Sequence, residues 1–258
     1  MFKAIRISIL LFILAAVAMA TWRNKTISVE WKYTLPVNVY PINGDGSAAS
    51  EQYLRALSVE EFKPIETFMQ EEAHRFGRGA HASIEMRLGK PIDQLPPATP
   101  VNKSGFDVML WSLKMRWWAY RHGDTFGPGP QVKVYLLYFD PATSSQLAHS
   151  TALQKGLIGV VNVFASRAMA KQNNFVIAHE FLHTLGATDK YDLATTLPYF
   201  PDGYANPQLE PLLPQQFAEI MGGRIPLSQG EAEMPVGLDK VLIGEKTARE
   251  INWRSLAD

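Results

Sequence analysis

The sequence of 258 residues contains no cysteine. A chain without cysteine has no disulfide framework, no thiolate ligand for a metal and no cysteine nucleophile. An excess of charge is also missing, since 25 lysines and arginines balance 25 aspartates and glutamates. A balanced chain has no overall field that attracts nucleic acid, so we expect no nucleic-acid partner. Any metal ion in this protein must therefore be held by histidine, aspartate or glutamate.

The N-terminus has an apolar run, but a short one. Lys3 and Arg6 precede an uncharged stretch at residues 7–21 that ends among small side chains. This order is typical of a secretory signal peptide, and 15 residues fall short of the ~20 that span a bilayer. We expect residues 1–20 to be a signal peptide or, if uncleaved, an anchor in the inner membrane. The protein would then be periplasmic, secreted or membrane-attached, and its lack of cysteine suits a bacterial envelope.

Residues 21–258 are expected to form one domain of the α/β (α+β) class. Strand-like and helix-like hydrophobic patterns alternate along the chain, which favours a mixed sheet. Prolines recur between Leu197 and Pro235, so the chain after residue 186 should be rich in loops. The expected strands lie at 27–42, 82–88, 131–139 and 156–164, and the expected helices at 58–76, 106–122, 173–186 and, as one helix or two, 237–253.

One segment carries a metal-binding pattern, His179-Glu180-Phe181-Leu182-His183. The surrounding apolar residues recur at helical spacing and Gly186 supplies a left-handed stop, so the segment should be a buried helix. Four helical residues turn through about 400° and rise about 6 Å, which puts the two histidines one above the other on one face. Two such imidazoles can bind one metal ion, with Glu180 close enough to act on a water beside it. A random order of these residues would produce the pattern roughly 0.8% of the time.

The longer pattern HEFLHTLGATD resembles the active-site motif of the metzincin clan of zinc metallopeptidases. That motif is HExxHxxGxxH or, in a minority, HExxHxxGxxD; the family within the clan is not identified. The resemblance implies one catalytic Zn²⁺ held by His179, His183 and Asp189, with Glu180 as general base. An aspartate oxygen is an accepted zinc ligand at about 2.0–2.2 Å.

The resemblance also carries expectations for the fold. It implies a mixed twisted sheet and an active-site helix in an upper half that ends at about residue 186, followed by a loop-rich lower half at 187–258. Gly186 would let the chain turn back towards the metal. A methionine in a tight turn beneath the metal is also implied, and Met221 fits that role.

Other carboxylates compete for the third ligand position. Asp192 lies three residues beyond Asp189, but its spacing does not match the motif, so we expect it to support the metal site or the loop. A different clan takes its third ligand from a glutamate on a later helix, and Glu210 or Glu219 could be so placed. Gly186 favours Asp189 because it lets that residue return to the metal.

Aromatic residues and the remaining histidines are weaker candidates. A phenol could assist an oxyanion, although packing tyrosines are commoner. The isolated histidines are expected to be exposed or hydrogen-bonded rather than ligating, and the tryptophan-rich cluster is expected to lie in the core. The tyrosines are Tyr191, Tyr199 and Tyr204, the histidines His74, His81, His122 and His149, and the cluster Trp111, Trp117, Trp118 and Tyr120.

The predicted function is an exported zinc-dependent metalloendopeptidase that hydrolyses peptide bonds with Glu180 as general base. Its partner is a peptide or protein substrate, lying extended along an exposed strand edge. The alternatives are a non-catalytic envelope protein with a structural metal site and a peptidase whose third ligand is Glu210 or Glu219. A structural zinc site usually has four protein ligands, whereas only three match here, which favours an open catalytic position.

Overall fold

The computed structural model describes residues 29–79, 82–100, 104–124 and 131–254 and, near the N-terminus, Arg6, Ile7, Leu11 and Phe12. The expected signal peptide or anchor at residues 1–20 therefore lies almost entirely outside the described residues. Within the part that is described, no helix is both long enough and apolar enough to cross a membrane.

A five-stranded mixed sheet forms the centre of the molecule, in the order β2-β1-β3-β5-β4. Neighbouring strands run parallel except β4, which pairs antiparallel with β5 at the edge. The middle strands are buried almost throughout, as expected of parallel strands covered on both faces. The strands are β1 (Leu35–Asn43), β2 (Ile84–Leu88), β3 (Val132–Phe139), β4 (Thr151–Leu153) and β5 (Ile158–Phe164).

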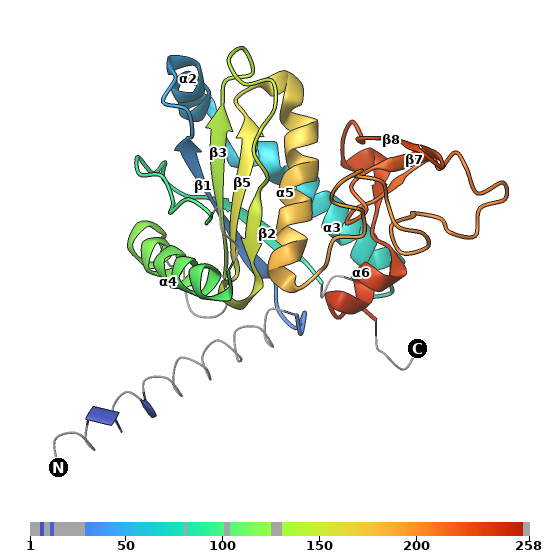
Figure 1. The fold of residues 1–258 in the computed structure, drawn as a ribbon, viewed down its shortest axis with the longest axis horizontal. Coiled ribbons are helices and arrows are strands. Elements are labelled where there is room, and N and C mark those ends of the chain that lie inside the picture. Colours follow the sequence, from blue (N-terminus) through green and yellow to red (C-terminus); the bar gives the residue numbers. More distant parts are fainter. Residues whose placement is uncertain are drawn as a thin grey trace.

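Helices cover both faces of this sheet (Figure 1). One face packs against α3 (Lys63–Arg75) and α5 (Ala170–Leu185), and the other against α4 (Gly105–His122). Alternation along β1 produces this arrangement, because Val37 and Val39 belong to the first core and Tyr40 to the second. A further helix, α2 (Ala48–Ala56), follows β1 and is capped by the Ser47 side chain. The expected mixed α/β class is confirmed.

The chain after α5 has little regular structure. Between Leu185 and Ala218 it forms neither helix nor strand, as the recurring prolines predict. Short strands then pair as β6 (Ala218–Glu219) with β9 (Val241–Leu242) and as β7 (Ile225–Ser228) with β8 (Glu231–Glu233). The last helix is α6 (Glu245–Glu250). We call residues 187–254 the lower half; it lies beside α5 and α3 in Figure 1.

Three expectations were wrong in part. The first strand begins at Leu35 rather than at residue 27. The C-terminal helix expected over 237–253 is only six residues long, because Val241 and Leu242 pair with β6. Trp117 and Tyr120 are 62% and 78% exposed, so the aromatic cluster is only half core. Helical spacing explains this last result, because these two residues project from the face of α4 opposite Trp111 and Trp118.

Candidate metal centre and adjoining cleft

The two histidines of the motif lie on α5, which is buried over most of its length. Their rings meet edge to face at 4.8 Å between centroids, and their Nε2 atoms are 3.1 Å apart. The helix ends at Gly186, whose φ of 113° is a left-handed conformation. A β-carbon there would come within 2.2 Å of the Gln154 side chain, so glycine suits the turn on two grounds.

This turn brings Asp189 back to the histidine pair. Its Oδ1 atom lies 3.0 Å from Nε2 of His183 and 3.2 Å from Nε2 of His179. Three ligands around a tetrahedral Zn²⁺ at about 2.0–2.1 Å stand about 3.3 Å apart, so the three atoms form a triangle of suitable size. The structure thus brings together all three residues that the motif predicts as ligands. Independently of Asp189, His179, Glu180 and His183 form a group that could hold a metal ion.

Hydrogen bonds orient both imidazole rings. Nδ1 of His179 lies 2.8 Å from the carbonyl of Ile220, and Nδ1 of His183 lies 2.8 Å from the carbonyl of Ala187. A carbonyl only accepts, so each Nδ1 must carry a proton, which leaves Nε2 of the neutral ring as a lone pair. While both rings are neutral, two lone pairs and a carboxylate oxygen therefore face one point; a proton on either Nε2 would make that nitrogen a donor to Asp189. A metal ion at that point would be bound by all three atoms.

The charges around the centre agree with this geometry. Burial lowers the pKa of His179, but hydrogen bonding to Asp189 and the charge of Glu180 raise it further, and the net shift is upward. Burial would raise the pKa of Asp189, yet the two histidines hold it well below its usual range. The site thus keeps a carboxylate ionised and favours a positive charge beside it.

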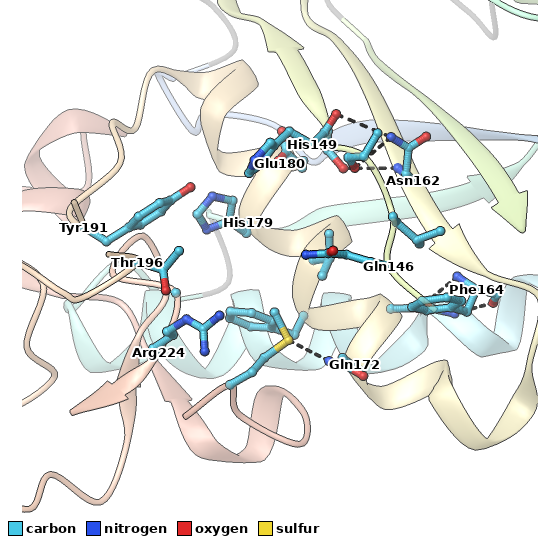
Figure 2. A pocket seen from close by; sticks show the side chains of 18 of the residues that line it. Gln146, His149, Asn162, Phe164, Gln172, His179, Glu180, Tyr191, Thr196 and Arg224 are labelled. Carbon is cyan, nitrogen blue, oxygen red and sulfur yellow. Dashed lines mark hydrogen bonds between the residues drawn. The ribbon is translucent and has the colours of Figure 1, made fainter. Parts of the chain in front are cut away.

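Glu180 lies next to the centre, in the wall of a cavity of about 360 Å³. Its side chain is buried, and burial raises its pKa against the opposing effect of the two histidines. Figure 2 shows Glu180 above His179, with Tyr191 facing His179 from the left and Thr196 and Arg224 below. One wall is the loop 145–150 that precedes β4, and the opposite wall belongs to the lower half.

The structure separates the other candidates. Tyr191 lines the cavity, where burial and the Asp189 charge raise its pKa to about 12. Tyr199 is 52% exposed and contacts Asp192, while Tyr204 meets Phe200 edge to face. Asp192 accepts hydrogen bonds from the loop that follows it, at Ala194 and Thr195, and so supports that loop as expected.

Neither later glutamate is brought to the histidine pair. Glu210 is exposed on a loop. Glu219 is fully buried, and its carboxylate accepts hydrogen bonds from the backbone N–H groups of Met221, Gly222 and Gly244 and from the Thr247 hydroxyl. These bonds hold the tight turn that contains Met221, which is itself fully buried. Since Ile220 in this turn bonds His179, the turn lies directly beside the metal centre.

The two neighbours of Asp189 in the chain, Thr188 and Lys190, are both bonded to the last helix, α6. The Glu250 carboxylate accepts hydrogen bonds from the backbone and hydroxyl of Thr188 and from Nζ of Lys190, at 2.7–3.0 Å. Lys190 is almost completely buried, so this ion pair is shielded from water. The lower half therefore positions Asp189, the residue predicted as third ligand.

Sequence reasoning missed three residues of the site. His149 was expected to be exposed, and it is, but the Asn162 side chain holds its loop over the cavity near Glu180. Arg224 and Glu250 drew no attention. The one sequence signal for Arg224 was its position, three residues after Met221, the proposed turn methionine. Of the other isolated histidines, His74 is exposed, His122 bonds the Trp118 carbonyl and His81 lies outside the described residues.

Comparisons with known proteins add little to this picture. No family model matches the chain, and no curated protein matches it. A solved structure described as that of a chaperone–substrate complex is similar over 86% of this chain, at 14% identity and a TM-score of 0.40. The chain spans about a third of the length of that structure, covering 33% of it. Likeness at this level carries no argument about fold family or function.

Proposed function

We propose that the protein is an exported zinc-dependent metalloendopeptidase of metzincin type. One observation carries the proposal: two imidazole lone pairs and the Asp189 carboxylate converge on one point, and Glu180 lies beside that point in the wall of an open cavity. A centre with three protein ligands and access to solvent is the arrangement of a catalytic rather than a structural zinc site. Peptide-bond hydrolysis is the reaction that this set of groups suits best.

Each residue has a defined task in this proposal. His179, His183 and Asp189 would hold Zn²⁺, which when bound supplies Lewis-acid chemistry to the scissile carbonyl and to water. Glu180 accepts the proton that the attacking water loses and returns it to the leaving amine. The raised pKa of Glu180 suits both transfers, because it lies closer to neutral pH than that of an exposed glutamate.

The edge of the sheet offers a place for an extended substrate. β4 is the outermost strand and runs antiparallel to β5, and the cavity begins in the loop that leads into β4. A peptide that pairs with β4 would add a strand and gain main-chain hydrogen bonds. The metzincin assignment has two further supports: the left-handed Gly186 before Asp189, and Met221 in a buried turn beside His179.

The direct test is Glu180→Gln in the full chain, with exposed Glu231→Gln as the matched control. We expect Glu180→Gln to lower kcat/KM on a peptide library by at least about 100-fold, the effect of losing a general base, with metal content unchanged. Glu231→Gln should match the wild type in both measurements. A wild type that binds metal without cleaving any peptide would support the structural-site alternative instead.

A further inference from the structure

Helix α4 carries an exposed apolar stripe. Six large side chains fall within about 100° of arc at 100° per residue. Each is 40% exposed or more, and Tyr120 reaches 78%. The stripe consists of Phe106, Met109, Leu110, Leu113, Trp117 and Tyr120.

The opposite face of the helix is already used. Trp111, Met115 and Trp118 are buried against the sheet, where they pack with Tyr135. The helix is therefore apolar on two sides, and only one side is needed to cover the sheet. Among the described residues nothing covers the other side, and a contiguous apolar patch of this kind marks an interaction surface.

Basic residues flank the stripe. Lys114 and Arg121 are exposed and lie about 70–90° from its centre, along the same side. Together with Trp117 and His122 they line a groove of about 460 Å³ at the edge of the stripe. The helix has one acidic side chain, Asp107, which lies at its first turn and bonds the capping residue Ser104. An apolar stripe with Trp, Tyr and flanking cations is the composition of a helix that lies in a membrane interface.

The place of α4 in the fold points the same way. Its C-terminal end contacts the start of the sheet, where the Gly123 carbonyl accepts from Lys133, the neighbour of Asn38 in β1. The chain that precedes β1 enters at the same end of the sheet but on its other face, where Val29 and Trp31 bond Asn252 and Ile251. Only seven residues lie between Thr21, the end of the apolar run, and Val29, so these two residues are at most about 28 Å apart. A retained N-terminal segment would hold this end of α4 close to the bilayer.

We propose that the stripe on α4 docks on the surface of an anionic lipid bilayer. The aromatic side chains enter the headgroup region, and Lys114 and Arg121 contact lipid phosphates. A second copy of the chain fits less well, because a twofold contact through the stripe would bring the flanking cations of both copies together. The proposal is independent of the peptidase activity.

The cysteine-free chain permits a direct test with a single label. A fluorescent label is attached in the full chain at Leu113→Cys, in the stripe, or at Val236→Cys, a more exposed control in the lower half on the other side of the sheet. Vesicles contain phosphatidylcholine alone or with phosphatidylglycerol, and acyl-chain nitroxides quench any label that contacts lipid. We expect quenching at 113 on the phosphatidylglycerol vesicles and little at 236. The double substitution Lys114→Glu and Arg121→Glu should abolish the quenching at 113, even where the N-terminal segment still attaches the chain to the vesicle.

Four results would overturn the proposal. These are absence of quenching at 113, quenching equal to that at 236, equal quenching on neutral vesicles, and quenching that survives the charge reversal. Two measurements without vesicles identify other occupants. Self-quenching at 113 that rises with protein concentration indicates a second copy. If the label at 113 is protected from quenching by aqueous iodide at low protein concentration, the chain's own N-terminal segment covers the stripe.

Discussion

At the scale of single residues, the candidate metal centre is a set of acceptors as long as both imidazole rings are neutral. Two imidazole nitrogens and a carboxylate oxygen lie 3.0–3.2 Å apart, and the outer nitrogen of each ring is committed to a carbonyl. Such a cluster is unfavourable without a cation and favourable with one. Metal binding should therefore stabilise the folded chain as well as serve catalysis.

Arg224 is the residue that we expect to select substrates. It is the one lysine or arginine among the described residues that line the cavity, and within the described ranges no carboxylate pairs with it. A substrate carboxylate, from an acidic side chain or a free C-terminus, would satisfy it. Arg224→Leu should lower kcat/KM for such substrates by about 10- to 100-fold, the value of a hydrogen bond to a charged group.

The measurement is kcat/KM on a series of peptides. The peptides differ at each position beside the scissile bond and have either a free or a blocked C-terminus. Neutral substrates serve as the control, since their cleavage by Arg224→Leu should stay near that of the wild type. Equal losses on acidic and neutral peptides would contradict a role in selection.

At the scale of elements, the turn after α5 brings Asp189 next to the two histidines. Gly186→Ala places a β-carbon on a left-handed residue, which should cost about 1–2 kcal/mol of folding free energy and displace Asp189. Gly230→Ala is the matched control, because its φ is not left-handed and nothing lies within 4 Å of the added carbon. Thermal unfolding and metal titration would check both variants. Gly186→Ala with unchanged metal affinity would show that the turn does not position the ligand.

Elements with a strong local pattern were predictable from sequence. The helix at 106–122 and the strand at 131–139 match α4 and β3 within one residue, and the motif spacing alone placed two histidines on one face. The return of Asp189 to the histidine pair was also foreseen, from the glycine stop and the resemblance to the metzincin motif, while its role as third ligand stays a prediction. These predictions succeeded where periodicity and chain stiffness decide the outcome.

Other features depend on contacts that sequence spacing does not reveal. Glu250 reaches Thr188 and Lys190 across 60 residues or more, and His149 reaches the cavity because Asn162 holds its loop. The C-terminal segment had an ambiguous pattern, and pairing with β6 turned part of it into strand. In each case tertiary contact overrode or added to local preference.

At the scale of the whole molecule, the ion pair of Lys190 with Glu250 ties α6 to the ligand loop. Glu250→Gln keeps the shape of the side chain but leaves a buried ammonium without its counter-charge. We expect a loss of about 2–3 kcal/mol in stability and weaker metal binding. Asp202→Asn, in the exposed pair with Lys246, is the control and should cost at most about 1 kcal/mol. Equal effects of the two substitutions would argue against the anchoring role.

The same pair should give a pH signature. Burial would raise the pKa of Glu250, but Lys190 and Thr188 lower it further, so the folded value lies below the ordinary one. Its contribution to stability is thus complete above about pH 4.3, the ordinary value, and is lost as the pH falls through the lowered one. The stability difference between wild type and Glu250→Gln should therefore shrink in acid, which denaturant unfolding at several pH values would measure.

The central claim, that His179, His183 and Asp189 hold one catalytic metal ion, is tested most directly by the metal content of the purified full chain. Elemental analysis would compare the wild type, Asp189→Ala and Asp192→Ala, the last a matched control whose carboxylate bonds its own loop. We predict about one zinc per chain in the wild type and in Asp192→Ala, and a clear loss in folded Asp189→Ala. A folded wild type without zinc after reconstitution, or full retention in Asp189→Ala, would contradict the account.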